Sequence, residues 1–412
     1  SVEGTSGFET DAQGNPLLPS ATTGATGNPG FDWSDFAPRL GLTYALGEEK
    51  KTLLRASYSR FAEQLRNGYS SQVQPLSYSY TYWYYEDLNG DGQVTQNEIV
   101  DFEDGPLWDN GYDPLGQQTF NRVDPSFTAP ITDELLLSVE HSLLPELVIG
   151  ATVTIRNKSD IAEFIRMVCD NGGGGCDGYG DPTLRPSVAS DYELAYTRTV
   201  TRPDGTTFDV PIYGFNSSVS EAQGTYMTNG SREQDYTGLA LTFNKRLSNR
   251  WMLRGNYTYS NWEWDVPANS NPDPNIYLGG AQDNGGSVLQ GSGTGSGAKG
   301  GVYISTGWSY SLTGMYQVAP DAAWGFNVSA NLYGREGYAI PYYTREFGVF
   351  ASSIRVQGTE NSDDFKLDDI HQMDLRVEKE VNVSDFGLTF GVEVFNLFNQ
   401  STVLQREHRL RR

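Results

Sequence analysis

The chain has 412 residues, with 29 lysines and arginines against 52 aspartates and glutamates, which gives a net charge of −23. Nucleic-acid phosphates require a basic protein surface, so this acidity excludes a DNA or RNA partner. Aromatic residues make up 13% of the chain, and tyrosine and phenylalanine favour strands. No apolar run reaches the length of about 18 residues that indicates a transmembrane helix. The composition therefore predicts an all-β protein.

Ten segments show the alternation of apolar and polar residues that is typical of a strand with two different faces. The clearest segment is 147–156, where Ile149, Ala151, Val153 and Ile155 alternate with small or polar residues. In chain order, the expected strands are 39–46, 54–59, 135–140, 147–156, 238–244, 251–260, 308–318, 324–332, 373–378 and 386–394.

The connections between these strands alternate between short and long. Tight turns are expected at 47–50, 144–146, 247–250, 319–322 and 382–385, and long connections at 62–131, 158–234, 265–301 and 336–369. Soluble sandwiches keep most loops short, whereas an outer-membrane barrel has short periplasmic turns and long extracellular loops. The pattern predicts a transmembrane antiparallel β-barrel of about ten strands with long extracellular loops, embedded in the lipid of the outer membrane of a Gram-negative-type bacterium.

The polar face of the expected strands carries charges, as at Arg55, Arg156, Arg254 and Glu393. Charges directed into a packed core would each need a partner, whereas charges that line a water-filled lumen need none. Aromatic residues such as Trp251 lie toward strand ends, as in the aromatic girdles of membrane barrels. The alternative fold is a large soluble β-sandwich or propeller.

The direction of the strands predicts that this chain is a portion of a larger barrel. With short turns in the periplasm, the first expected strand runs inward and the last runs outward, whereas a bacterial single-chain barrel begins outward and ends inward. We therefore expect further strands before Ser1 and after Arg412. We interpret 1–35 as a loop or linker, 36–399 as the barrel portion, and 400–412 as a truncated or unusual C-terminal tail.

The two cysteines, Cys169 and Cys176, are separated by six residues of which four are glycines. Glycines allow the chain to fold back on itself, so this spacing predicts a loop tip closed by a disulfide, which implies an oxidising compartment. The alternative is a pair of free thiols. No zinc site is expected, because the three histidines do not have the spacing of zinc ligands.

Segment 87–98 matches the pattern of an EF-hand calcium loop at its informative positions. Gly92 stands at the sixth position, where the chain turns sharply, and Glu98 stands at the twelfth, where a carboxylate binds with both oxygens. We expect a structural Ca²⁺ that orders an extracellular loop, and the alternative is a solvated acidic turn. The expected ligands are Asp87, Asn89, Asp91, the carbonyl of Gln93, Thr95 or its water, and Glu98.

Other segments are less informative. The aromatic residues at 80–85 are interpreted as packing beside the calcium loop or as a ligand-facing patch, with packing favoured. The acidic segment 363–369 is interpreted as a solvated loop face rather than a second cation site, and 291–300 as a flexible linker rather than a phosphate-binding loop. No combination of residues supports nucleophilic or acid–base catalysis, so we do not expect an enzyme.

Four stretches carry a family resemblance: Phe-Ala-Pro-Arg-Leu-Gly-Leu-Thr-Tyr at 36–44, Leu-Arg-Ala-Ser-Tyr-Ser-Arg-Phe at 54–61, Asp-Leu-Asn-Gly-Asp-Gly at 87–92 and Val-Phe-Asn-Leu-Phe-Asn at 394–399. Over about 36–404, the chain resembles the C-terminal half of TonB-dependent outer-membrane receptors, especially the Oar-like subgroup with its carboxypeptidase-regulatory-like N-terminal domain. The resemblance implies a 22-stranded barrel in which these ten strands are the twelfth to the twenty-first.

The resemblance also implies the uptake of a transported ligand, which it does not identify, and coupling to the TonB system through a plug in the parent protein. This chain contains no plug, no TonB box and no closing strand after the Asn-Leu-Phe-Asn motif. A protein of another class remains the alternative: a secreted or surface-anchored calcium-dependent β-rich binding or adhesion protein without membrane contact.

Overall fold

The computed structural model describes residues 2–3, 22–23, 33–64, 69, 72, 81–82, 85–99, 108–109, 119–178, 180–267, 270–277, 286–289, 303–383 and 386–410. Most of the expected linker 1–35 and the glycine-rich segment 291–300 therefore lie outside the described residues. Within the described part of the chain, no helix is long and apolar enough to cross a membrane.

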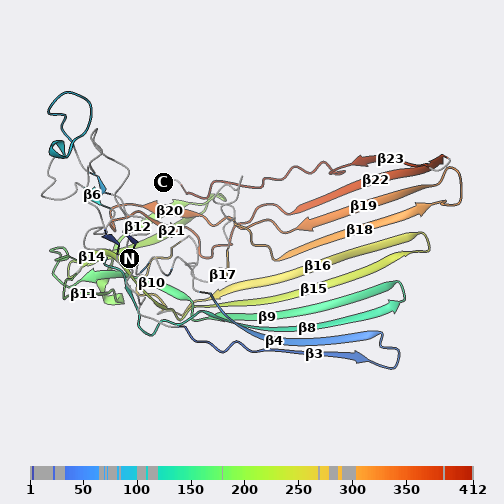
Figure 1. Ribbon diagram of the computed structural model, residues 1–412, viewed down its shortest axis with the longest axis horizontal. Helices are drawn as coiled ribbons and strands as arrows, with labels where there is room; N and C mark the ends of the chain where they lie inside the picture. The colour runs from blue at the N-terminus through green and yellow to red at the C-terminus, as the bar shows by residue number, and fades with distance from the viewer. Residues whose placement is uncertain are drawn as a thin grey trace.

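All ten expected strands are confirmed, and they form one antiparallel sheet in which the strands are hydrogen-bonded in chain order. Figure 1 shows them side by side. A short strand, β17 (Gly286–Ser287), pairs with β16 in addition. The long strands are β3 (Arg39–Leu46), β4 (Thr52–Ala62), β8 (Ile131–Leu144), β9 (Leu147–Ser159), β15 (Glu233–Ser248), β16 (Trp251–Asp265), β18 (Trp308–Val318), β19 (Phe326–Arg335), β22 (Ile370–Val383) and β23 (Phe386–Val394).

The short turns lie together at one end of the sheet, and the long connections leave from the other end (Figure 1). In the turn between β3 and β4, Gly47 has a φ of 78°, a left-handed conformation that glycine adopts without steric cost. The alternation between short and long connections in the sequence is thus a true sidedness of the molecule.

One face of the sheet is apolar and exposed. Leu137 on β8 lies opposite Ala56 on β4 and Val153 on β9, and the exposed fractions of Leu137 and Val153 are 45% and 36%. Farther along the same face, beyond Leu135, Asp133 forms an ion pair of 2.8 Å with Arg60. A broad exposed apolar surface that ends at a row of polar residues is the pattern expected of strands that face lipid.

The opposite face carries charges that are paired across neighbouring strands. Arg55 donates to Glu140 at 2.8 Å, and Arg156 donates to Glu134. From the sequence we expected the charges that line an aqueous lumen to need no partner. The structure shows that Arg55 and Arg156 each have one. The side chains of Arg55 and Glu140 are 44% and 46% exposed, so the pair is hydrated and contributes little to stability.

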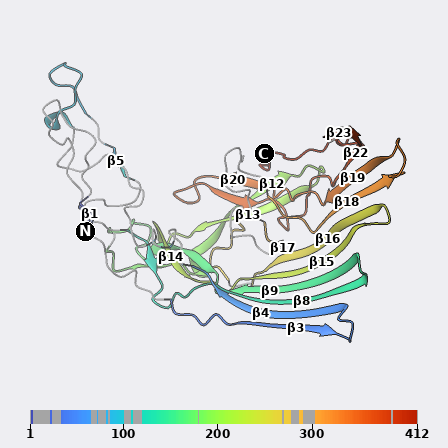
Figure 2. The same cartoon turned by 45° about the vertical axis from the view of Figure 1, so that its right-hand side comes forward.

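The sheet has two edges, because no pairing joins β3 to β23 within the described residues. Figure 2 shows the strands as an open, curved sheet. A sheet in lipid has to close, since unpaired backbone groups in hydrocarbon cost several kcal/mol each. The open sheet therefore agrees with the expected portion of a larger barrel.

The long connections fold into a layer of small sheets at the end of the molecule opposite the short turns (Figure 2). We call this the loop layer. It includes the two-stranded pair of β5 (Thr81–Tyr82) and β6 (Trp108–Asp109). A further small pair, β1 (Val2–Glu3) with β2 (Thr22–Thr23), precedes the large sheet in the sequence. The larger units of the loop layer are the sheet of β7 (Arg122–Val123), β10 (Ala162–Cys169), β11 (Leu184–Pro186) and β14 (Ser220–Asn229), the hairpin of β12 (Tyr192–Thr201) and β13 (Thr207–Phe215), and the pair β20 (Tyr343–Glu346) and β21 (Ile354–Gln357).

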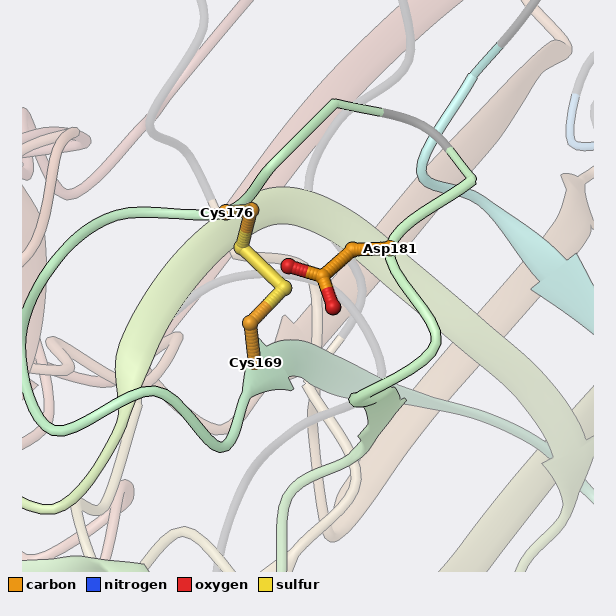
Figure 3. A group of neighbouring side chains, drawn as sticks. All are labelled: Cys169, Cys176 and Asp181. Carbon is orange, nitrogen blue, oxygen red and sulfur yellow. A yellow bond between two sulfur atoms is a disulfide. The ribbon is translucent and has the colours of Figure 1, made fainter.

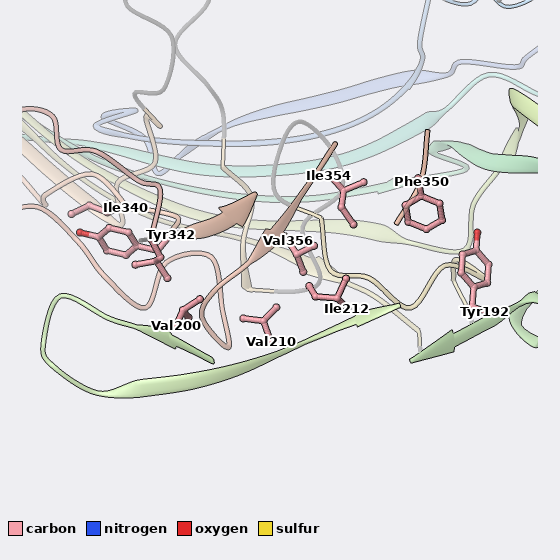
Figure 4. Packing of buried hydrophobic residues seen from close by; sticks show 10 residues of the cluster. Tyr192, Val200, Val210, Ile212, Ile340, Tyr342, Phe350, Ile354 and Val356 are labelled. Carbon is pink, nitrogen blue, oxygen red and sulfur yellow. The ribbon is translucent and has the colours of Figure 1, made fainter. Parts of the chain in front are cut away.

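Among the described residues, the largest cluster of buried apolar side chains lies in this loop layer. Figure 4 shows Val210 and Ile212 of the β12–β13 hairpin packing near Val356 of β21. Leu410 joins the same cluster, and its N–H donates to the carbonyl of Tyr343 on β20 at 2.8 Å. Three distant parts of the sequence, including the segment interpreted as an unusual tail, thus form one packed body.

Candidate functional site

The predicted calcium loop lies in the connection between β4 and β8, and it protrudes from the loop layer at the upper left of Figure 1. An antiparallel bridge between Tyr85 and Ile99 closes its base, and the N–H of Glu86 donates to the carbonyl of Glu98 at 2.8 Å. The two ends of the loop are therefore held together by the backbone.

The first half of the loop is organised by two aspartates. The carboxylate of Asp87 accepts the N–H groups of Gly90 and Gly92 at 2.7 and 3.0 Å, and the carboxylate of Asp91 accepts the N–H of Gln93 at 2.7 Å. Gly92 has a φ of 70°, which explains why glycine stands at the sharp turn. The side-chain oxygen of Asn89 accepts the N–H of Asp91 at 2.8 Å.

The second half of the loop is organised by Glu98, which ends the short 3-10 helix η2 (Gln96–Glu98) and is only 2% exposed. Its carboxylate accepts the hydroxyl and the N–H of Thr95 at 2.7 and 2.8 Å. The N–H of Leu88 reaches the other carboxylate oxygen at 3.2 Å. These hydrogen bonds, with that of the Thr95 hydroxyl as the largest cause, lower the pKa of Glu98.

The residues of the loop fit a hard cation, because carboxylate, amide, hydroxyl and carbonyl oxygens are the ligands that Ca²⁺ takes in proteins. The structure brings Thr95 and Glu98 into direct contact and places Asp87, Asn89 and Asp91 in a second group. The N–H of Leu88 links the two groups through Glu98. Hydrogen bonds hold the carboxylates of Asp87, Asp91 and Glu98 along one short loop. A divalent ion bound there would draw these carboxylates together.

The aromatic residues before the calcium loop are described only in part. Tyr82 belongs to β5, which pairs with β6, and Tyr85 is 58% exposed. Tyr80, Trp83 and Tyr84 lie outside the described residues. The choice between packing and ligand contact for this aromatic run stays a hypothesis.

Figure 3 shows the disulfide between Cys169 and Cys176. The Cα atoms of the two cysteines are 5.6 Å apart. Asp181 lies beside the disulfide, and the two sulfurs and a carboxylate oxygen of Asp181 lie within 4.8 Å of one another. Both sulfurs are used in the disulfide, so this group offers no thiolate to a metal. Asp181 accepts the N–H of Asp177 and the hydroxyl of Thr183 at 2.8 and 2.6 Å, and these bonds, that of Thr183 first, lower its pKa.

The acidic segment 363–369 holds loops in place through hydrogen bonds. The carboxylate of Asp364 accepts the N–H of Asn361 at 2.9 Å, and that of Asp369 accepts the N–H of Gly337 at 3.0 Å. Lys366, within the same segment, forms an ion pair of 2.9 Å with Glu336. These contacts support a structural interpretation of the segment.

Sequence reasoning did not find the buried ion pair between Glu163 at the start of β10 and Arg232 just before β15. Their nitrogen and oxygen are 2.6 Å apart, and the side chains are 3% and 5% exposed. Asn271 donates to the second oxygen of Glu163 at 2.7 Å. The two residues of the pair are 69 positions apart, so no local sequence signal indicates it.

A cavity of about 670 Å³ lies at the outward end of β15 and β16, and sequence reasoning did not find it either. Its walls include two aromatic rings, those of Tyr236 and Trp262, whose centroids are 6.4 Å apart at an interplanar angle of 88°. Glu263, Glu336 and Lys366 also line it. The only available signal was the alternation of aromatic and acidic residues beyond the apolar part of β16.

The model of a family described as "Outer membrane beta barrel domain" matches residues 3–284 of the chain. Among curated proteins, none matches.

Solved structures are similar in fold only. The siderophore receptor PiuA from Acinetobacter baumannii is 10% identical with a TM-score of 0.41, and the match covers 91% of this chain and 32% of the receptor. The outer membrane transporter YddB from Escherichia coli is 11% identical with a TM-score of 0.38, covering 86% and 36%. A ferric enterobactin receptor mutant from Pseudomonas aeruginosa is 14% identical with a TM-score of 0.39, covering 89% and 35%. The chain thus spans about a third of the length of these structures.

Proposed function

This chain belongs to the family of outer membrane beta barrel domains, and from that premise we propose that it is the barrel portion of a TonB-dependent receptor that takes up a substrate. The protein is located in the outer membrane. The observation that supports contact with the membrane is the exposed apolar face of the large sheet. A secreted protein without membrane contact would have to cover that face.

The finer assignment to TonB-dependent receptors rests on the sequence resemblance, and the local structure of its motifs supports it. Asn396, in the Asn-Leu-Phe-Asn motif, has a φ of 49°. Its N–H donates to Asp374 on β22 at 2.9 Å, and its side-chain amide donates to the carbonyl of Gln400 at 3.0 Å. The motif therefore has a defined role, since it anchors the chain to β22 where the pairing of β23 ends.

The test uses the full-length protein, purified in detergent, and the periplasmic domain of TonB. We expect a direct complex that is lost when the segment before the plug is deleted, because coupling passes through the plug. An outer-membrane protein that does not bind TonB at tens of micromolar would refute the receptor assignment while leaving the barrel intact. A barrel of this kind has no need of catalytic residues, and we propose no enzymatic role.

For loop 87–98 we propose calcium binding as an accessory property of the receptor. The supporting observation is the buried carboxylate of Glu98, which already faces the hydroxyl of Thr95 and the first half of the loop. Three carboxylates within twelve residues repel one another, so a bound divalent ion would favour the closed loop. When bound, Ca²⁺ would stabilise an extracellular loop.

Calorimetric titration of the full-length protein with Ca²⁺ tests this proposal. Glu98→Gln should weaken binding by about tenfold or more, because it removes a charged bidentate ligand. Glu86→Gln is the matched control, since Glu86 is exposed and lies just outside the loop. Equal affinities of the two variants would disprove the site, and both variants should still fold into the membrane.

A further inference from the structure

We propose that reduction of the disulfide turns Cys169, Cys176 and Asp181 into a binding site for a thiophilic divalent metal ion such as Zn²⁺. The two sulfurs are bonded to each other in the oxidised protein, so the site exists only after the S–S bond is broken. Two thiolates and a carboxylate supply three protein ligands and leave a fourth position to water, an arrangement that zinc accepts. The three histidines, whose spacing is unlike that of zinc ligands, take no part in it. The site does not depend on the proposed receptor function.

The fold already gathers the three side chains. The two sulfurs and a carboxylate oxygen of Asp181 lie within 4.8 Å of one another, and Figure 3 shows the carboxylate directed toward the disulfide. Around a tetrahedral zinc ion, with Zn–S bonds of about 2.3 Å and Zn–O bonds of about 2.0 Å, neighbouring ligand atoms lie about 3.5–3.8 Å apart. Small side-chain movements therefore bring the three ligands to a common ion.

Two of the three ligands are fixed by backbone contacts that do not involve the disulfide. Cys169 is the last residue of β10, and it pairs with Leu184 on β11 and Ser220 on β14. The N–H of Asp181 donates to the carbonyl of Gly178 at 3.2 Å, and the N–H of Leu184 donates to the carbonyl of Asp181 at 3.1 Å. Reduction therefore leaves Cys169 and Asp181 in place.

Cys176, the third ligand, follows a run of four glycines that can adjust. Gly172, Gly173 and Gly175 have positive φ angles. Among the described residues, a Cβ atom on Gly172 or Gly175 would meet nothing within 4 Å apart from its chain neighbours, so the tip is not packed at these positions. Glycine adopts positive and negative φ with similar ease. The tip can therefore move the sulfur of Cys176 to the separation that a metal ion requires.

The carboxylate of Asp181 is oriented and still has an acceptor position for a metal. It accepts the N–H of Asp177 and both the N–H and the hydroxyl of Thr183. An ionised carboxylate offers about four acceptor positions, and these three bonds leave one. Hydrogen bonds of this kind orient the carboxylates that bind metals. They also keep this one ionised, because they lower its pKa, with that of the Thr183 hydroxyl as the largest cause.

Burial makes the reduced group favour a bound metal over free thiolates. Cys169 is fully buried and Asp181 is 8% exposed, and both cysteines pack with Met167 and Ala222 in one apolar cluster. Two thiolates beside a carboxylate repel one another strongly in such surroundings. Without a metal, the cysteines therefore stay protonated as thiols, whereas a divalent ion offsets two of the three negative charges.

The reduction needs a dithiol or a phosphine from outside the protein. The reductant gives two electrons, the S–S bond breaks, and each cysteine sulfur takes up one proton, which comes from the dithiol or from water. The dithiol closes into its own disulfide, or the phosphine takes the oxygen atom of water and becomes its oxide. Binding of Zn²⁺ then releases both thiol protons to the solvent.

Titration of the full-length protein in detergent with Co²⁺ tests the proposal, with excess Ca²⁺ present to occupy sites that have only oxygen ligands. Co²⁺ serves as a coloured substitute for Zn²⁺, because a thiolate bound to it gives a near-ultraviolet absorption band that oxygen ligands do not give. We expect this band in protein reduced with a phosphine and not in oxidised protein, and Zn²⁺ should abolish it, since thiolates favour zinc. No band in the reduced protein, or the same band in the oxidised protein, would overturn the proposal.

Two variants test the carboxylate ligand. Asp181→Asn should lower the Zn²⁺ affinity of the reduced protein by about tenfold or more, because it replaces a charged ligand by a neutral amide. Asp177→Asn is the matched control, because Asp177 is an exposed carboxylate in the same loop and contacts Asp181 through its backbone N–H. Equal affinities of the two variants would overturn the site as proposed, since the cysteines would then bind the metal without Asp181.

Discussion

The hydroxyl of Tyr310 on β18 lies 2.8 Å from Nδ1 of His371 on β22, although β19 runs between these two strands. Gly334 is the β19 residue opposite both of them in the register. Because it has no side chain, the two rings meet above it, 6.0 Å apart and nearly parallel, and Trp308 stacks beside them. This glycine is thus required by side-chain packing across three strands.

Substitution of Gly334 by alanine should destabilise the barrel. A Cβ atom at this position would lie 2.5 Å from the ring of Tyr310, and overpacking of this kind costs about 1–3 kcal/mol. Urea unfolding in detergent, followed by heat-modifiable gel mobility, measures the loss. Gly314→Ala is the control, because its Cβ would meet the flexible end of Leu253 at 3.1 Å and the carbonyl oxygen of Met252 at an ordinary contact distance of 3.7 Å. The prediction fails if both variants unfold at the same urea concentration.

Removal of one partner from the buried pair of Glu163 and Arg232 should loosen the loop layer. Arg232→Met leaves the Glu163 carboxylate buried without its guanidinium, a change that costs about 3–5 kcal/mol in buried pairs. Arg250→Met is the matched control, because its pair with Asp321 is 52% and 89% exposed, and such pairs contribute about 0–1 kcal/mol. Hydrogen exchange of β10 and β14 reports the difference. Unchanged exchange in Arg232→Met would show that the pair does not hold the layer together.

The ten strands of the large sheet could be predicted because each has one face against lipid and one against water, which gives a period of two. The residues at which the strands begin or end on the side of the loop layer could not be predicted. β8 begins at Ile131 and β15 at Glu233, several residues before the expected starts, because outside the lipid the outer face carries Asp133 and Asp235 instead of apolar residues. At the other end, β19 begins at Phe326 rather than Trp324, since the tight turn extends to Gly325.

The loop layer was harder to predict for two reasons. β10 is buried on both faces in its last residues, so Met167, Val168 and Cys169 show no alternation. The β12–β13 hairpin does alternate, and the Pro-Asp-Gly sequence at 203–205 indicates its turn, so a closer search of the sequence would have found it. The disulfide and the calcium loop were visible because both are local. The cavity and the pair of Glu163 with Arg232 join distant segments, which no single-sequence pattern indicates.

Reduction of the disulfide should open the loop between Cys169 and Cys176 locally. Cross-linking across so short a loop stabilises by about 2–3 kcal/mol in the chain-entropy account. Cys169 is fully buried beside Met167 and Ala222, so its strand should stay in place while the glycine-rich tip becomes mobile. Protease cleavage within 170–178 should therefore require a reductant. Equal cleavage with and without reductant would contradict this expectation.

Calcium binding to loop 87–98 should depend on pH through Glu98. Its pKa is lowered below the ordinary value of 4.5 by the hydrogen bonds from Thr95. A lowered pKa means that the ordered loop favours the carboxylate, so this contribution is complete above about pH 4.5 and is lost as the pH falls through the lower value. The Ca²⁺ affinity should be constant from pH 7 to 5 and fall below that. A fall that begins at pH 6 to 7 would indicate another titrating group.

The orientation of the barrel gives the last prediction. Asp204 lies at the exposed tip of the β12–β13 hairpin in the loop layer, and Glu48 lies in the exposed turn between β3 and β4 at the opposite end of the sheet. If the loop layer is extracellular, a membrane-impermeant maleimide should label Asp204→Cys on intact cells and Glu48→Cys only after the outer membrane is permeabilised. The two native cysteines do not interfere, because both are in the disulfide.

Both positions are exposed turn residues, so differences in local accessibility do not account for a difference in labelling. The physical reason for the orientation is that short turns suit the periplasmic side, whereas long loops such as those of the packed loop layer lie on the extracellular side of outer-membrane barrels. Labelling of Glu48→Cys on intact cells, with Asp204→Cys protected, would reverse the topology. The calcium loop and the cavity would then face the periplasm, and neither could meet a ligand from outside the cell.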